Sequence, residues 1–93
     1  METFKKTSVL ATADSLIHGA RQDNYGGVEE SFGKIAEGWA MILNAEVSPV
    51  QVSLCMIWLK VMRHVAGGSQ DDWIDMAGYA GLGDELEINQ EEE

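Results

Sequence analysis

The sequence predicts an all-α protein, an antiparallel four-helix bundle with helices at about 7–20, 28–43, 49–66 and 70–86. Apolar residues recur at helical spacing through all four segments, and the sequence has no strand-like alternation of useful length. Short connections rich in Gly, Asn and Ser separate the segments, which favours antiparallel neighbours. With 93 residues, of which 45% are hydrophobic, the chain is long enough to bury one core.

The first two helices are predicted from stripes of apolar side chains. Residues 7–20 carry the first stripe, and the glycine-containing loop 18–27 ends it. Residues 28–43 carry a clearer stripe with a period near 3.6 residues. Gly33 and Gly38 interrupt this second helix, each at a cost of about 1 kcal/mol relative to Ala. We therefore expect close helix packing at these two glycines.

The third helix has the clearest start in the sequence. Ser48 can cap it, Pro49 suits its first position, and Gln51 completes a capping box. Residues 49–66 are apolar nearly all round, which is typical of a central helix or of one in a subunit interface. We therefore predict a homo-oligomer, a dimer or larger, formed through this helix. Cys55 lies within the apolar run, where we expect a buried and unreactive thiol.

The fourth helix is predicted to start after a Gly-Gly-Ser turn, with Asp72 placed to complete a second capping box. Residues 1–86 would then form a single helical domain, and residues 87–93 an acidic disordered tail. Tryptophans occur in the apolar stripes of three helices, and we expect all of them in the core. They are Trp39, Trp58 and Trp73.

Charge and cysteine content exclude several classes of function. The formal net charge is −10, and six of the 16 acidic residues lie in the last ten positions. Binding to nucleic-acid phosphate needs clustered Lys and Arg, so direct nucleic-acid binding is not expected. The sequence has no run of about 18 apolar residues, so a membrane span is not expected. A single cysteine fits a reducing compartment, and we expect a cytoplasmic protein.

Two charged faces are predicted to meet where the third and fourth helices fold back on each other. Lys60 and Arg63 share one face of the third helix, and Asp71 and Asp75 share one face of the fourth. One interpretation is an interhelical salt-bridge network, with Asp72 as a cap. The other is a site in which Asp71 and Asp75 hold Mg²⁺ while Lys60 and Arg63 contact phosphate groups. The residues alone leave both interpretations open.

Several blocks between Arg21 and Ala80 form a recognisable series: RQDNYGG, SFGKIAEGW, SPVQVSLCMIWLKVMRHVAGG and DDWIDMAGYAGLG. In order, they resemble a family of short, functionally uncharacterised phage and prophage proteins. Members of that family look like this series in order: R-x-x-x-Y-G, N-F-x-x-I-A-x-x-W, a helix ending K-x-x-R, and D-x-x-x-D-x-A-G-Y. Ser31 stands here where the family has Asn. The resemblance implies a phage-type helical protein without an assigned activity. If the protein is phage-encoded, the expected cytoplasm is that of the host.

More distantly, the helical pattern is similar to the MazG-type all-α nucleoside triphosphate pyrophosphohydrolases. That resemblance implies Mg²⁺-dependent cleavage between the α and β phosphates, with Lys60, Arg63, Asp71 and Asp75 as the implied positions. MazG-type enzymes carry an E-x-x-E pair where this chain has Lys60 and Arg63. Catalytic residues are therefore not assigned.

Three functions remain open from the sequence. The protein can be an interaction module, such as a dimeric adaptor or an inhibitor of a host defence protein, in which the charged residues of the third and fourth helices are structural. It can be a Mg²⁺-dependent pyrophosphohydrolase. It can also sequester a nucleotide signal in the same pocket without turnover. Tyr25 is expected to bind the nucleotide, by stacking on the base or by closing the pocket. Incubation with nucleotides and Mg²⁺ distinguishes the three. Turnover supports the enzyme, binding without turnover supports sequestration, and the absence of both supports the interaction module.

Overall fold

The computed structural model describes residues 6–19 and 27–92, and within them it has four helices and no strand. These helices are α1 (Val9–His18), α3 (Val28–Leu43), α4 (Pro49–Val65) and α5 (Gln70–Glu92). The predicted all-α class is confirmed, and the bounds of α3 and the start of α4 agree with the sequence prediction. No helix of the described residues is long and apolar enough to cross a membrane.

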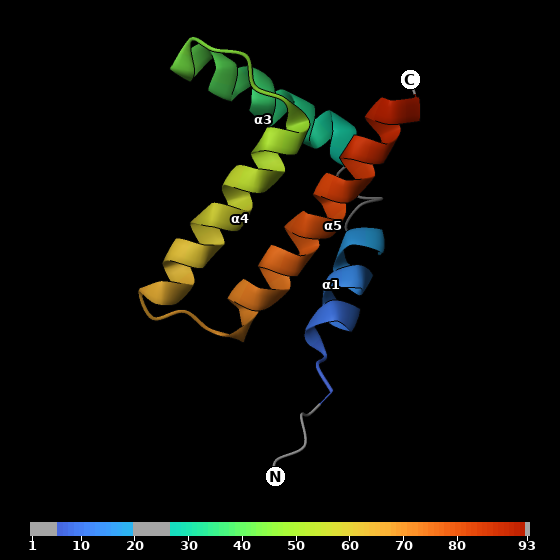
Figure 1. Ribbon diagram of the computed structural model, residues 1–93, viewed down its shortest axis with the longest axis vertical. Helices are drawn as coiled ribbons and strands as arrows, with labels where there is room; N and C mark the ends of the chain where they lie inside the picture. Colours follow the sequence, from blue (N-terminus) through green and yellow to red (C-terminus); the bar gives the residue numbers. More distant parts are fainter. Residues whose placement is uncertain (1–5, 20–26, 93) are drawn as a thin grey trace.

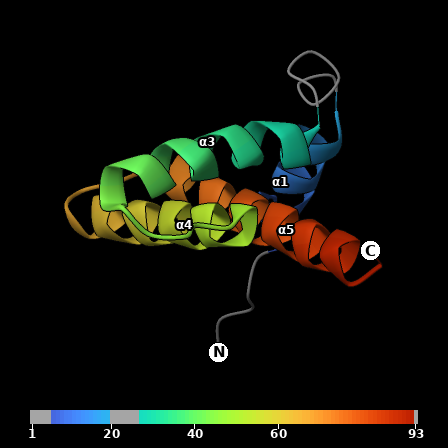
Figure 2. The same ribbon diagram turned by 90° about the horizontal axis from the view of Figure 1, so that it is seen from above.

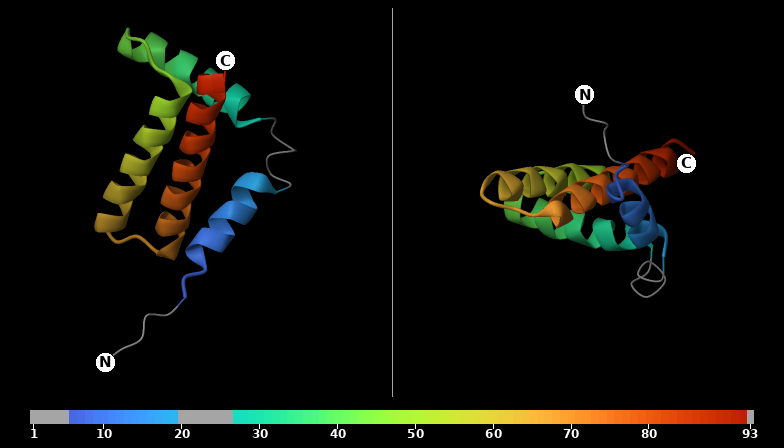
Figure 3. Two further views of the ribbon diagram at one scale, coloured as in Figure 1. Left: turned by 45° about the vertical axis from the view of Figure 1, so that its right-hand side comes forward. Right: turned by 90° about the horizontal axis from the view of Figure 1, so that it is seen from below.

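The helices are arranged around an antiparallel hairpin of α4 and α5 (Figure 1). α3 crosses this hairpin near the N-terminal end of α4, and α1 packs on the side of α5 away from α4 (Figures 1 and 3). α1 runs in the same direction as α5. Seen from above, α3 lies on one face of the α4–α5 layer, and the opposite face carries no helix of the described residues (Figures 2 and 3). The arrangement is therefore more open than an up-and-down bundle.

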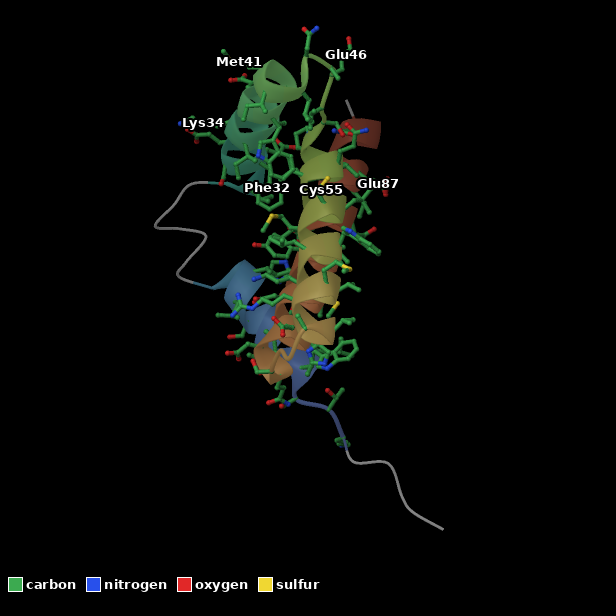
Figure 4. All side chains as sticks on the ribbon, turned by 90° about the vertical axis from the view of Figure 1, so that its left-hand side faces the viewer. Phe32, Lys34, Met41, Glu46, Cys55 and Glu87 are labelled. Carbon is green, nitrogen blue, oxygen red and sulfur yellow. The ribbon has the colours of Figure 1, made fainter. Side chains whose placement is uncertain are left out.

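The core lies where α3 crosses the hairpin. Its buried members are Phe32, Ala36, Val52 and Leu86. Phe32 points from α3 toward α4 (Figure 4), and its ring centroid lies 6.2 Å from that of Tyr79 on α5. Partly buried side chains complete the core: Val28, Trp39, Val47, Val50, Met56, Tyr79 and Leu82. Burial at this crossing supplies the hydrophobic free energy that holds three helices together.

A small side chain on α4 allows close packing against α5. Ser53 is only 1% exposed, and its hydroxyl donates a hydrogen bond to the Tyr79 carbonyl at 2.5 Å. A Cβ atom at Gly83 would lie 3.2 Å from the Ser53 oxygen. Because neither residue carries a bulky side chain, the two backbones approach closely, and the buried hydroxyl is still satisfied.

The end of α5 differs from the prediction. The helix continues to Glu92 instead of ending near Leu86, so residues 87–92 extend it where a separate acidic tail was expected. Leu86 is 1% exposed and anchors this end of the helix in the core. Glu, Ile, Asn and Gln follow it; Glu and Gln are good helix formers that outnumber the single Asn, and no Gly or Pro stops the helix.

Three expectations about packing are corrected. A Cβ atom at Gly33 or Gly38 would meet nothing within 4 Å, so close helix packing does not explain these glycines. Trp58 and Trp73 are 64% and 52% exposed, and only Trp39 packs against the core. Cys55 is also exposed. For Trp58 and Cys55 the cause is that α3 covers only part of α4, so side chains of the apolar run of α4 are left facing outward.

Candidate functional site

The turn between α4 and α5 is built from two glycines with different roles. Gly67 adopts a φ of +114°, a conformation that L side chains rarely adopt. At Gly68, an added Cβ atom would collide with the Asp72 carboxylate and would lie 2.7 Å from the His64 Cα atom. Gly68 therefore leaves the space in which the Asp72 side chain lies against the end of α4.

The Asp72 carboxylate is the centre of the charged residues that join α4 and α5, here called the charged set: Lys60, Arg63, His64, Asp72 and Asp75. It is 2% exposed, and its Oδ2 accepts hydrogen bonds from the Ser69 backbone N–H at 3.0 Å and from His64 Nδ1 at 3.2 Å. Its Oδ1 lies 3.5 Å from Arg63 Nε. The Ser69 hydroxyl in turn accepts from the Asp71 backbone N–H at 3.3 Å. Asp72 thus caps α5, as predicted, and also ties the start of α5 to the end of α4.

These contacts keep Asp72 ionised. Burial raises the pKa of this carboxyl, but the His64 and Ser69 hydrogen bonds and the charge of Arg63 together outweigh burial and lower the pKa from its ordinary value of 3.8. A carboxylate only accepts hydrogen bonds, so His64 Nδ1 must carry the proton in this contact. The Trp73 ring packs against the His64 ring, with 4.8 Å between the two ring centroids.

Lys60 and Asp75 form the second interhelical ion pair. Lys60 Nζ lies 3.1 Å from Asp75 Oδ2, one turn further along the hairpin from Asp72. The Lys60 side chain is 15% exposed, whereas the Asp75 side chain is 38% exposed. The predicted meeting of cations and carboxylates between these helices therefore takes place at two points along α4 and α5.

The structure divides the predicted site residues into two groups. Lys60, Arg63 and Asp75 come together with partners between α4 and α5. Asp71, expected to face Arg63, is exposed, and Asp72 takes its place. Consecutive residues point about 100° apart around a helix, so the two acids cannot both face α4. Tyr25 lies outside the described residues.

The described residues contain no group of three or more His, Cys, Asp or Glu side chains placed to hold a metal ion. An ion at Asp71 and Asp75 would also compete with the Lys60 ammonium for the Asp75 carboxylate. Two helical carboxylates with waters satisfy the minimum that Mg²⁺ requires, so Mg²⁺ at these residues stays a prediction.

The role of Asp72 as an interhelical partner was missed from the sequence, although a signal for it exists. Arg63 and His64 occupy the last turn of α4, and Asp72 is the third residue of α5. A carboxylate at this position of a capping box points back toward the preceding turn. In a hairpin with so short a connection, that direction leads to the last turn of α4.

The outward side of α4 is the second candidate site. It carries a continuous apolar face, here called the α4 stripe: Leu54, Cys55, Trp58, Leu59, Met62 and Val65, all of them exposed. Trp58 is 64% and Val65 78% exposed. Charged side chains of α4 lie outside the stripe, at Lys60 and Arg63. Figure 4, which views the molecule from the α4 side, shows Cys55 on this helix.

α1 is attached to α5 through a smaller contact that includes a histidine. Nδ1 of His18 lies 2.9 Å from Asp14 on α1, and its Nε2 contacts the Glu85 carboxylate on α5. The hydrogen bond with Glu85, followed by that with Asp14, raises the pKa of His18 above 6.5. Ile17 packs against Gly78 and Gly81 of α5 beside this contact.

Comparison with known proteins gives a family without an assigned activity. Residues 8–87 match DUF6378, a domain of unknown function. The chain is 37% identical over 87 residues to the Gene 55 protein of Mycobacterium phage L5, covering 91% of this chain and 56% of that protein. It is 43% identical over 75 residues to the Gene 55 protein of Mycobacterium phage D29, covering 80% and 50%.

The chain thus spans about half the length of the curated relatives it matches. No solved structure matches it. The expected resemblance to phage proteins is confirmed, whereas the similarity to MazG-type enzymes is not among these matches. The chain belongs to the DUF6378 family, whose function is unknown.

Proposed function

We propose that this protein is a helical interaction module that binds a helix of a protein partner through the α4 stripe. The observation that carries the proposal is the exposure of six neighbouring apolar or sulfur-containing side chains on one face of α4. Contiguous apolar patches of this kind on soluble proteins mark interaction sites. Trp58, near the middle of the stripe, has the size and rigidity of the residues that dominate interface energies.

The charged set supports a structural role beside this interface. Lys60 pairs with Asp75, and Arg63 and His64 pair with Asp72. Each contact joins α4 to α5, so together they set the distance and rotation between the two helices. An α4 helix held in this way presents its stripe as a preformed surface, which lowers the entropic cost of binding.

A photo-crosslinking experiment tests the proposal. A photoreactive amino acid replaces Trp58, and a matched control carries it at Glu37, an exposed position on α3. The full chain is irradiated in the cells that produce it, and the adducts are mapped by mass spectrometry. We expect adducts from position 58 to map to an apolar helical segment of one identified protein. Adducts no more abundant or specific than those from position 37 would contradict the proposal.

Nucleotide handling is the second candidate, supported by the solvent-facing part of the charged set. The Arg63 side chain is 68% exposed and that of Asp75 38% exposed, so a phosphate or Mg²⁺ has access to both. Either ligand must compete with an existing ion pair. The candidate covers binding of a nucleotide signal as well as pyrophosphohydrolysis at Lys60, Arg63, Asp71 and Asp75.

A panel of nucleoside triphosphates and cyclic nucleotides with Mg²⁺ distinguishes these possibilities. Release of pyrophosphate would support the enzyme, and a thermal shift without turnover would support sequestration. For either result, Lys60→Met should abolish the effect, because the cation nearest the interhelical carboxylates is removed. The absence of both effects would leave the interaction module as the sole proposal.

A further inference from the structure

We infer that the partner of the α4 stripe is a second copy of this chain, bound with the two α4 helices antiparallel. This inference rests on the proposed function, for which it names the partner and the geometry. Four features carry it: the spacing of the stripe, the absence of charge within it, the distribution of charge along the hairpin, and the sizes of the side chains that would face each other.

The spacing of the stripe is that of a helix-packing interface. Cys55, Trp58, Met62 and Val65 follow one another at intervals of three, four and three residues. This alternation is the a/d pattern that brings one side of a helix repeatedly against a partner helix. Leu54 and Leu59 flank the pattern at the adjoining positions and widen the face. A helix is therefore the partner shape that the stripe fits.

A second copy meets this surface without burying a charge. None of the six stripe residues is charged, so two copies placed stripe to stripe bring only apolar and thiol groups into contact. A two-fold dimer uses the same patch on both subunits, and a self-complementary patch must lack charge at its centre. The stripe satisfies this condition even though the whole chain has a net charge of −10.

The charges along the hairpin favour the antiparallel orientation. At the end where α4 begins, the exposed acids Glu46, Asp84 and Glu87 gather, and Figure 4 shows Glu46 and Glu87 at this same end. At the opposite end, Lys60 and Arg63 offset two of the three acids in the first turns of α5. Parallel copies would place two acidic ends side by side. Antiparallel copies place each acidic end beside the less acidic end of the partner, which reduces that repulsion.

The side chains that would face each other across two antiparallel α4 helices are also well matched in size. With the two-fold axis at the middle of the stripe, Trp58 faces Met62 of the second copy, and Cys55 faces Val65 of the second copy. A flexible thioether adapts well to a large aromatic ring. The two Cys55 residues would lie about 15 Å apart along the helices, from the rise of 1.5 Å per residue.

The oligomeric state of the full chain is the first test. We expect a dimer at micromolar concentrations in analytical ultracentrifugation, and a monomer for Trp58→Glu. Met41→Glu is the matched control, because Met41 is 84% exposed on α3, outside the stripe, and the dimer should persist. Circular dichroism confirms that both variants stay helical. A wild-type monomer throughout this range, or a Trp58→Glu variant that stays dimeric, would overturn the inference.

Cysteine crosslinking then tests the orientation. Val65→Cys should form an intermolecular disulfide with Cys55 of the second copy under mild oxidation, because these positions face each other. Wild type, with Cys55 alone, and the double variant Cys55→Ala with Val65→Cys should not crosslink. Their like cysteines would lie about 15 Å apart along the helices, beyond disulfide reach. Efficient Cys55–Cys55 crosslinking in the wild type would show another orientation or register and overturn the inference.

Failure of the inference and failure of the proposed function give different results. A monomeric chain whose position 58 crosslinks specifically to a helix of another protein retains the interaction module but loses the second copy as its partner. A monomeric chain without specific adducts at position 58 loses both.

Discussion

Asp72 Oδ2 accepts a hydrogen bond from His64 Nδ1 at 3.2 Å, and this contact joins the beginning of α5 to the last turn of α4. The same oxygen also accepts from the Ser69 backbone N–H. One carboxylate therefore serves as a helix cap and as an interhelical partner. Because Asp72 is buried and Asp71 is exposed, neighbouring acids of the same type have different consequences for stability.

Alanine substitution of these two acids should separate their roles. Asp72→Ala removes the cap of α5 and leaves His64 and Arg63 without their partner, so we expect the melting temperature to fall by roughly 5–10 °C. Asp71→Ala should change it by no more than about 2 °C, because an exposed side chain away from such contacts contributes little. Thermal denaturation followed by circular dichroism measures both. Equal effects would contradict the assignment of Asp72 as the central residue.

The ion pair of Lys60 with Asp75 should show a measurable coupling. In a double-mutant cycle of Lys60→Met and Asp75→Asn, we expect a coupling free energy of about 1 kcal/mol, at the upper end for partly exposed pairs. Urea denaturation of the four proteins gives the value. The matched control is a second cycle, Glu30→Gln and Lys34→Met. These two residues form an exposed contact at 3.4 Å within α3 and should couple less. A Lys60–Asp75 coupling indistinguishable from zero would mean that this contact does not hold the hairpin.

The contact of His18 with Glu85 predicts a pH dependence of α1 docking. The folded pKa of His18 lies above 6.5, so its stabilising contribution is fully present below pH 6.5 and is lost as the pH rises through the folded pKa. We expect amide hydrogen exchange in α1 to be faster at pH 8.5 than at pH 6, after correction for intrinsic exchange. His18→Gln should remove this difference. A wild-type α1 that exchanges alike at both values would exclude the histidine as its anchor.

Two glycine substitutions should have opposite signs. Gly33→Ala lies in the middle of α3, where a Cβ atom meets nothing within 4 Å, so it should stabilise the protein by about 0.5–1 kcal/mol through helix propensity. Gly68→Ala places a methyl group against the Asp72 carboxylate and the backbone of His64, so it should destabilise. Denaturant midpoints measure both effects. A neutral Gly68→Ala would show that the turn relaxes without cost.

The sequence predicted local features well where the relevant contacts are between near neighbours. The Ser48 capping box is present with both hydrogen bonds, 3.1 Å from the Gln51 N–H to Ser48 Oγ and 2.9 Å from the Ser48 N–H to Gln51 Oε1. Helical periodicity and the Pro49 boundary likewise located α3 and the start of α4. The meeting of Lys60 with Asp75 followed from one short turn.

Features that depend on contacts between distant segments were not predicted. Trp58 and Cys55 lie in an apolar run, and periodicity alone does not say which side of such a helix another helix covers. The capping position of Asp72 is visible in the sequence, but its pairing with Arg63 and His64 also requires that α5 pack closely against α4, as it does at Ser53 and Gly83. In this protein the sequence alone determined where helices start and turn, because capping and periodicity act over a few residues. Only the tertiary structure decided which faces are buried, because burial depends on where the other helices pack.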